Sequence, residues 1–527
     1  MAKRGVAWRG LMLDSARLTE RYDYYRELLP QLADWGYNTL WWHFSDDEGF
    51  AIKMKSHPEL ASPYALSRRQ VTDFVAAAGE LGINVVPELE SLGHTLFITR
   101  HPEYAHLFNG NEWGHNAICP SHPDTLPIIA ELLVETAELF PSRYLHMGLD
   151  EAVIGDCPRC AERADGRPSW RLLAEHILDV HDMVTSLGRR MIMWADGVEA
   201  HADLLTELPR DIVLAHWHYR NVPSGVLTRS AAAGFDVVGV PAISGQKLLP
   251  RVNNFQNVDD MRAELATVPP ERCRGMVSCW WEPQRILRDT IPMAIHHASL
   301  EVSPTDSAAA TTEFAREYFG LRRAAVGPAL WRLHELAPAD DPLRFLYPDT
   351  PLDLHQVLTF DAAAVLRHAN ETATIHTTLA DAIPVVKKHA ESYQAYCLAA
   401  DILAAGWANA QDFHGAMSCY GQAAAYTDAK RPREHVAACL DEALSQLQDA
   451  AARSKRIARA ASAEWDRTRH KRDPKKDNSS PLLRQRACRA VLPILTQSAA
   501  YLAALSKTAR TQIAAYKKDG PFPTLMG

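Results

Sequence analysis

From the start of the chain to about residue 300, short apolar runs alternate with stretches whose apolar positions recur at helical spacing. The short runs predict buried strands, and the stretches between them predict amphipathic helices. Gly36, Gly82 and Gly188 each follow a predicted helix, a common position for glycine. The predicted helices include 20–35, 68–81, 124–139 and 170–187, and the predicted strands are 6–13, 37–43, 83–89, 143–149, 190–194, 212–217, 236–240 and 274–280.

This alternation predicts the fold class. Eight strands interleaved with helices are typical of an α/β protein built as a (β/α)8 TIM barrel. The alternative is an open doubly wound sheet. No Gly-x-Gly-x-x-Gly segment follows the first predicted strand, so a dinucleotide-binding fold has little support.

The pattern changes after about residue 335. The segment 337–353 is rich in Pro and Asp and predicts a domain boundary. Beyond it only helical periodicity remains. We predict a barrel over 1–335 that is followed by an all-α C-terminal domain over 336–527. Its long helices are expected near 381–404, 433–463 and 483–517, the last with a kink at Pro493.

Composition narrows the class of protein. A formal net charge of −8 argues against a nucleic-acid partner. No stretch approaches the roughly 18 apolar residues needed to span a bilayer, and Met1–Gly10 lacks the apolar core of a secretory signal. Nine cysteines, an odd number in a long chain, do not indicate a disulfide framework. The expectation is a cytoplasmic protein without a membrane or nucleic-acid partner.

The chemistry is expected where barrel strands end, because TIM-barrel active sites lie at the C-terminal face. Carboxylates supply general acid–base groups, and indole rings stack on sugars. A single tryptophan would more readily be core, but several beside acids favour a carbohydrate substrate. The residues placed at these strand ends are Arg9, Asp14, His43, Asp46, Glu88, Glu90, His94, Asp150, Glu151, Trp194, Asp196, Trp217, His218, Tyr219, Trp280, Trp281 and Glu282.

Four motifs follow one another on the first four predicted strands. They are Arg9–Arg17 (RGLMLDSAR), Asn38–Phe50 (NTLWWHFSDDEGF), Val86–Thr95 (VPELESLGHT) and His146–Glu151 (HMGLDE). Together they resemble glycoside hydrolase family 20, the β-N-acetylhexosaminidases, and the last motif matches that family's His-x-Gly-x-Asp-Glu signature. In the third motif Leu92 replaces the family's Pro. The resemblance covers about residues 5–300 and leaves the helical part outside.

The resemblance implies an exo-acting, retaining hydrolase that removes terminal β-linked GlcNAc or GalNAc by substrate-assisted catalysis. Glu151 would be the general acid and base, and Asp150 would orient the 2-acetamido group. His94 and Asp46 would brace the acid. Adjacent residues of a strand point to opposite faces, so Asp150 and Glu151 can serve one sugar only where the strand opens into its loop.

The same resemblance implies a set of substrate-binding residues. Arg9 would bind sugar hydroxyls, Glu282 would hold the outer hydroxyls, and tryptophans would wall the pocket. The family's acetamido-binding Tyr after strand seven has no counterpart in 240–247, so Tyr219 after strand six is the candidate to replace it. The predicted substrate-binding residues are Arg9, Trp194, Trp217, Tyr219, Trp280 and Glu282.

Alternative functions stay open from the sequence. One is a barrel glycosidase with another sugar preference and a protein nucleophile, Glu88 or Glu90; another is a catalytically silent carbohydrate-binding protein. His216-x-His218 resembles a metal-ligand pair, but the amidohydrolase His-x-His follows strand one. Cys157-x-x-Cys160 resembles half of a zinc site, but no second half is visible, so loop structure is favoured. The expectation is neither a metal nor a cofactor.

Overall fold

The computed structural model describes residues 8–110, 116–154, 157–244, 248–336, 361–471 and 491–524, and every absence stated below concerns these residues. The chain divides into two compact units. The first holds the described residues up to 244 with Val252–Pro283 and Ala294–Ser303, and the second holds 248–251, Gln284–Met293 and the described residues from Pro304 onward. The predicted boundary segment 337–353 lies outside the described residues, so the domain limit at residue 335 stays a prediction.

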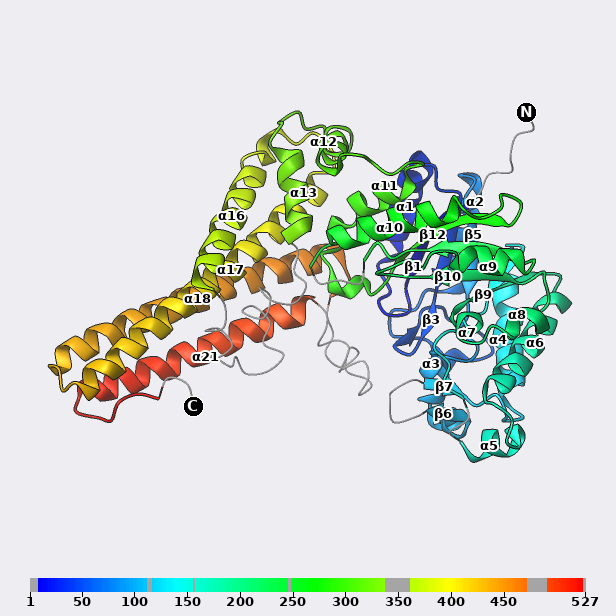
Figure 1. Ribbon diagram of the computed structural model, residues 1–527, viewed down its shortest axis with the longest axis horizontal. Coiled ribbons are helices and arrows are strands. Elements are labelled where there is room, and N and C mark those ends of the chain that lie inside the picture. Colours follow the sequence, from blue (N-terminus) through cyan, green and yellow to red (C-terminus); the bar gives the residue numbers. More distant parts are fainter. Residues whose placement is uncertain are drawn as a thin grey trace. The chain divides into compact units, whose positions relative to one another are not determined.

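The first unit is built around a closed barrel of parallel strands (Figure 1). The strands follow one another around the barrel in the order β1-β12-β11-β10-β9-β8-β5-β2. The predicted (β/α)8 fold is therefore confirmed, with each strand inside or within one residue of its predicted range. The strands are β1 (Trp8–Asp14), β2 (Thr39–His43), β5 (Asn84–Glu88), β8 (Tyr144–His146), β9 (Arg190–Trp194), β10 (Val213–Trp217), β11 (Asp236–Val240) and β12 (Cys273–Trp280).

Helices and two small hairpins complete this part of the chain. Helix α2 begins with a full capping box, in which Ser67 accepts from the backbone of Gln70 and the Gln70 side chain accepts in return. The helices are α1 (Tyr22–Asp34), α2 (Arg68–Glu80), α3 (Leu96–Thr99), α4 (Thr125–Leu139), α5 (Pro158–Ala164), α6 (Trp170–Ser186), α7 (Asp196–Ala200), α8 (Leu204–Glu207), α9 (Val226–Ala232), α10 (Val252–Leu265) and α11 (Pro292–Ser299). The hairpins are β3 (Ser45–Asp46) with β4 (Gly49–Phe50), and β6 (Phe108–Gly110) with β7 (Asn116–Ile118).

The pleat of the barrel strands decides which side chains point inward. A buried apolar cluster that includes Met12, Trp41, Val86, Ile192 and Cys279 fills the interior. Two residues further along their strands, toward the carboxyl ends, the inward positions become polar. Strand register aligns these positions as Asp14, His43, Glu88 and His146.

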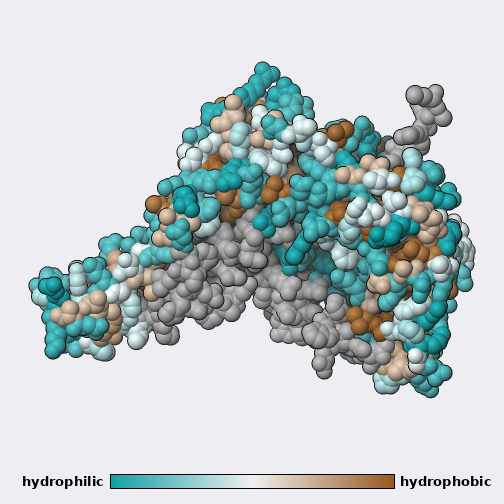
Figure 2. All heavy atoms as spheres, viewed as in Figure 1, coloured by the Kyte–Doolittle hydropathy of each residue, from teal (hydrophilic) through white to brown (hydrophobic). Residues whose placement is uncertain are grey.

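The second unit is helical. Its long helices α17 and α18 pack against each other, α16 packs on α17, and α21 packs on α18 (Figure 1). Alanine and leucine side chains fill the seam between them, while hydrophilic residues predominate on the outer faces seen in Figure 2. The helices are α12 (Ser307–Tyr318), α13 (Val326–Leu336), α16 (Ala362–Ala380), α17 (Ala390–Asp428), α18 (Arg433–Thr468) and α21 (Val491–Lys517).

One predicted helix of this unit has the wrong bounds. The range 381–404 begins instead with a 3-10 turn at Ile383–Val385, and α17 starts only at Ala390 and runs on to Asp428. Pro384 inside the turn explains the later start, because proline cannot supply the backbone N–H that a continuing helix needs. Residues 483–490 lie outside the described chain, so the kink at Pro493 stays a prediction. No described helix has the length and apolarity to cross a membrane.

Candidate active site

A buried ion pair occupies the centre of the barrel mouth. Glu88 is 0% exposed, and it accepts a hydrogen bond from the indole N–H of Trp194 at 2.8 Å. Nδ1 of His43 lies 3.0 Å from Oε2 of Glu88. Burial alone would lower the pKa of His43, but the carboxylates of Glu88 and Asp46 outweigh it and raise that pKa well above its usual value. His43 is therefore a cation between two acids.

Arg17 extends this network toward the rim. Its guanidinium lies 3.0 Å from Oδ2 of Asp14 and 2.6 Å from Oδ2 of Asp46. A third carboxylate, that of Glu48, lies 3.3 Å from Nε of Arg17. The planar, forked donor set of arginine suits such multiple contacts. Arg17 and His43 thus balance the carboxylates that the strand ends concentrate here.

Asp150 and Glu151 follow β8 where the backbone leaves the strand. Leu149 and Glu151 have φ angles of 77° and 48°, and Gly148 has a φ of 62°. These left-handed conformations break the strand pleat, so adjacent side chains no longer point to opposite faces. Nε2 of His94 lies 3.6 Å from Oδ2 of Asp150 and 3.2 Å from Oε2 of Glu151. Both carboxylates therefore meet at one imidazole.

Gly148 is needed at this turn for two reasons. Its positive φ is unfavourable for other residues, and a Cβ here would overlap the carboxylate of Glu90. Glu90 itself is 1% exposed. Burial, together with the charges of Asp150 and Glu88, raises the pKa of Glu90 well above its usual value. The protonated form of Glu90 is therefore favoured beneath the turn.

Asp150 has a perturbed pKa of the kind found in acid–base sites. Burial raises the pKa of Asp150 to about 7, with the nearby charges of Asp196, Glu88 and Glu151 adding to the effect and His94 opposing it. Glu151 is the more accessible of the pair, with 44% of its side chain exposed against 14% for Asp150. Its backbone N–H donates to Oδ2 of Asp196 at 2.9 Å. The deeper acid thus has a raised pKa, and the outer acid is the more exposed to solvent.

An aromatic wall stands beside the acids. Trp281 donates its indole N–H to the Tyr219 hydroxyl oxygen at 2.7 Å. The indole also lies under the Arg17 guanidinium at 4.9 Å and edge-on to the His43 ring at 5.0 Å. Trp217 lies next to Tyr219, with ring centroids 5.0 Å apart. These three aromatic side chains are half-buried, as expected for the lining of a cleft.

Two predicted substrate-binding residues are placed away from the mouth. Arg9 lies near the start of β1, five residues before Asp14, which at strand spacing is about 16 Å. Its guanidinium pairs with Glu301 at 3.3 Å, so its predicted contact with sugar is wrong. Trp280 pairs in register with Leu13 and faces outward, edge-on to Tyr24 at a centroid distance of 6.2 Å. Its predicted place in the pocket wall is wrong as well.

The other predicted residues lie at the carboxyl end of the barrel. Asp46 and His94 lie together, with Oδ1 of Asp46 3.6 Å from Nδ1 of His94. Glu282 has a left-handed backbone, and its N–H donates to Oδ2 of Asp14 at 3.0 Å. Trp194 is 1% exposed and forms the floor beneath the mouth rather than a side wall. The sequence placed His43 and Trp281 at strand ends without indicating their contacts, and it did not distinguish Arg17 within the first motif.

Metal-ligand types also gather near the mouth. After β10, both imidazoles of the His216-x-His218 pair contact Glu199, with His216 Nδ1 2.6 Å and His218 Nε2 3.2 Å from its oxygens. Burial alone would raise the pKa of Glu199, but the two imidazoles outweigh it and lower the pKa to about 2. Glu199, His216 and His218 thus form one acid–imidazole cluster of metal-ligand types. Asp46, Asp47 and His94 form a second group of ligand types.

Comparison with known proteins identifies the barrel. Residues 6–244 match the model of glycosyl hydrolase family 20, catalytic domain. This part of the chain resembles the catalytic domain of glycosyl hydrolase family 20. The resemblance of the four motifs is thereby confirmed, and the Asp150–Glu151 turn lies inside the matched range.

Family 20 relatives match the chain in part. A β-hexosaminidase of Vibrio furnissii is 29% identical over 272 residues, 44% of this chain and 43% of the relative. A β-N-acetylhexosaminidase of Cellulomonas fimi is 29% identical over 253 residues, 45% and 47% of the two chains. The chain thus spans less than half the length of these curated relatives. The crystal structure of a Flavobacterium johnsoniae chitobiase has the same fold, with a TM-score of 0.50 at 18% identity, covering 82% of this chain and 74% of the chitobiase.

Proposed function

We propose that this protein is an exo-acting, retaining glycoside hydrolase that removes terminal β-linked N-acetylhexosamine by substrate-assisted catalysis. The family 20 domain supports the reaction class. The observation that carries the proposal is the meeting of Asp150 and Glu151 at Nε2 of His94, at the open end of the barrel. A sugar bound there contacts one acid that is exposed and one that is buried.

The reaction needs two steps. In the first, the 2-acetamido oxygen of the sugar attacks the anomeric carbon while the bond from that carbon to the aglycone oxygen breaks, and Glu151 gives its proton to the leaving oxygen. In the second, water attacks the same carbon, its proton passes to Glu151, and the acetamido oxygen leaves. Asp150, next to the acetamide N–H, stabilises the positive charge that develops on this group. Glu151 acts at the leaving oxygen and Asp150 at the 2-acetamido group, and the turn after β8 brings both side chains to one imidazole at the mouth.

Arg17 takes the part first assigned to Arg9. It lies at the mouth beside Asp14, and Glu282 contacts the same carboxylate through its backbone. Arg17 and Glu282 together offer donors and an acceptor for sugar hydroxyls. Trp281 supplies the flat apolar face on which a sugar ring stacks.

Tyr219 takes the place of the family's acetamido-binding Tyr, which the segment after strand seven lacks. Its oxygen accepts from Trp281, and its O–H, which contacts the Cys279 thiol in the unliganded site, would turn to donate to the acetamido oxygen. Burial raises the pKa of Tyr219 well above its usual range, with the charges of Asp150 and Glu88 contributing. The hydroxyl therefore stays a donor throughout the working pH range.

Burial argues against a protein nucleophile. Glu88 and Glu90 are 0% and 1% exposed, and Glu88 is held by His43 and Trp194. A nucleophile must reach the anomeric carbon. These two carboxylates lie beneath the site instead, which favours the acetamide of the substrate in that part.

The test compares two chromogenic substrates that differ at one position. The protein should release nitrophenol from the aryl β-N-acetylglucosaminide and far less from the aryl β-glucoside, which lacks the internal nucleophile. A thiazoline analogue of the cyclic intermediate should inhibit competitively. Equal turnover of both substrates, or turnover that thiazoline leaves unchanged, would remove the substrate-assisted mechanism. Binding of N-acetylglucosamine without any turnover would show a silent sugar-binding protein.

A further inference from the structure

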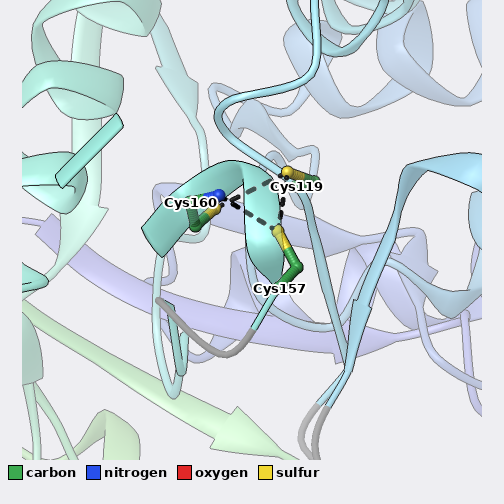
Figure 3. A group of neighbouring side chains, drawn as sticks. All are labelled: Cys119, Cys157 and Cys160. Atoms are coloured by element: carbon green, nitrogen blue, oxygen red, sulfur yellow. Dashed lines mark hydrogen bonds between the residues drawn. The ribbon is translucent and has the colours of Figure 1, made fainter. Parts of the chain in front are cut away.

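Three cysteines from two separate segments of the chain lie close together (Figure 3). Cys119 follows strand β7, and Cys157 and Cys160 lie at the beginning of helix α5. Sγ of Cys119 lies 3.5 Å from Sγ of Cys157 and 3.6 Å from Sγ of Cys160. In a tetrahedral zinc site with bonds of about 2.3 Å, neighbouring sulfurs are roughly 3.7 Å apart. The three sulfurs are therefore spaced as ligands of one ion.

Hydrogen-bond donors surround these sulfurs. The hydroxyl of Ser121 donates to Sγ of Cys160 at 3.3 Å, and the amide of Asn109 donates to the same atom at 3.7 Å. The backbone N–H of Cys160 donates to Sγ of Cys157 at 3.3 Å. Such donors stabilise the negative charge of thiolates, and outer contacts of this kind orient metal ligands. Cys119 and Cys160 are buried, so the group is shielded from solvent.

The chain offers a fourth ligand at a matching position. Cys119-Pro-Ser-His122 and Cys157-Pro-Arg-Cys160 repeat one spacing, and three cysteines with one histidine are a common structural zinc set. The ring of His122 now faces His106, with centroids 4.9 Å apart, and its Nδ1 accepts from the backbone of Asp124 at 3.2 Å. Rotation of the side chain gives up this hydrogen bond, the contact with the Asp124 carboxylate at 3.8 Å and the ring contact with His106. The second ligand pair that a zinc site needs beside Cys157 and Cys160 thus begins at Cys119, 38 residues before Cys157.

We propose that Cys119, Cys157 and Cys160 bind one zinc ion as thiolates, with His122 rotating in as the fourth ligand. The three thiols release their protons to solvent as the ion binds. The ion ties the segment after the β6–β7 hairpin to the chain that leaves β8. Cys157 follows Glu151 by six residues, so the site braces the loop that carries both acids.

The first test measures the metal in the full chain, purified without chelator. We expect about one zinc per chain by elemental mass spectrometry, and X-ray absorption with three sulfurs and one nitrogen around the ion. Treating the unsubstituted protein with an organomercurial should release the zinc to a chromogenic chelator. This measurement needs no variant and therefore does not depend on the folding of one.

Matched variants locate the site. Cys119→Ser and Cys157→Ser should lose the zinc, and His122→Ala should release it to a competing chelator faster than the unsubstituted protein does. Cys439→Ser changes a half-buried cysteine of α18 and should keep the full zinc content. Zinc-free protein with reactive thiols, iron in place of zinc, or a disulfide between Cys119 and either partner would overturn the proposal. Equal zinc in Cys157→Ser and Cys439→Ser would overturn it too.

Discussion

Nε2 of His94 lies 3.2 Å from Oε2 of Glu151, while the other ring nitrogen faces Oδ1 of Asp46 at 3.6 Å. One imidazole therefore connects the exposed acid to a carboxylate buried behind it. Burial alone would lower the pKa of His94, but Asp150 and Asp46 outweigh it and raise that pKa well above its usual value. Asp46 in turn contacts His43, which contacts Glu88. Acids and imidazoles alternate from the barrel centre to its rim and fix the position of Glu151.

The first prediction concerns the acid itself. Glu151→Gln keeps the shape of the side chain but cannot protonate a leaving group, so kcat on an aryl β-N-acetylglucosaminide should fall by about 10²–10⁴-fold. A dinitrophenyl glycoside, whose leaving group departs without a proton, should lose far less in the first step. Glu162→Gln on the exposed face of α5 is the matched control and should keep full activity. Equal losses on both substrates would contradict an acid role for Glu151.

The second prediction follows from the pKa of Asp150, which is raised to about 7. The mechanism needs the carboxylate form, so kcat/KM should rise with pH, reach half of its maximum near this value and level off above it. Between the usual pKa of 3.8 and about 7, the folded protein holds a proton that the unfolded chain releases, so this acid costs stability as pH rises through that window.

Asp150→Asn has no such proton. The thermal midpoint of the variant minus that of the unsubstituted protein should therefore be larger at pH 8 than at pH 5. Activity should be lost at both pH values. A difference in midpoint that is the same at the two pH values would show that Asp150 does not titrate in this window. Thermal scans of the full chain at both pH values measure it.

The sequence predicted the barrel well because the signals for strands are local. Short apolar runs and the glycines after helices mark each βα unit without reference to its neighbours. The acids after β8 were also found, since the motif His146–Glu151 is continuous. The structure was needed to decide which residues reach the site wherever this depends on strand register or on segments far apart in the sequence.

Two pairs of residues illustrate this limit. The first motif holds two arginines, and only the end of β1 at Asp14 shows that Arg17, not Arg9, reaches the mouth. Likewise Trp280 and Trp281 are adjacent, and the pairing of β12 with β1 decides which one faces inward. Pleat parity is a property of the whole sheet, so a single run of sequence cannot supply it.

The third prediction separates the two arginines. Arg17→Lys keeps the positive charge among three carboxylates but loses the planar fork, so kcat/KM should fall by about tenfold to a hundredfold with the fold intact. Arg17→Met would leave those carboxylates uncompensated and should destabilise the protein by about 3–5 kcal/mol. Arg9→Lys should change neither property, since its partner is the exposed Glu301. A loss of activity in Arg9→Lys that matches Arg17→Lys would contradict the placement of Arg17 at the sugar.

The last prediction concerns Tyr219 and selectivity for the acetamido group. Tyr219→Phe removes the hydroxyl that accepts from Trp281. Without this donor the acetamido oxygen is held less firmly, so kcat/KM for the N-acetyl substrate and the affinity for thiazoline should both fall by about tenfold. Trp281→Phe removes the other end of the same hydrogen bond but leaves the Tyr219 hydroxyl in place. If Tyr219 binds the acetamide, Tyr219→Phe will lose affinity for thiazoline but keep more of its affinity for a sugar without the acetamido group. If Tyr219 only supports Trp281, the two variants will lose thiazoline affinity equally.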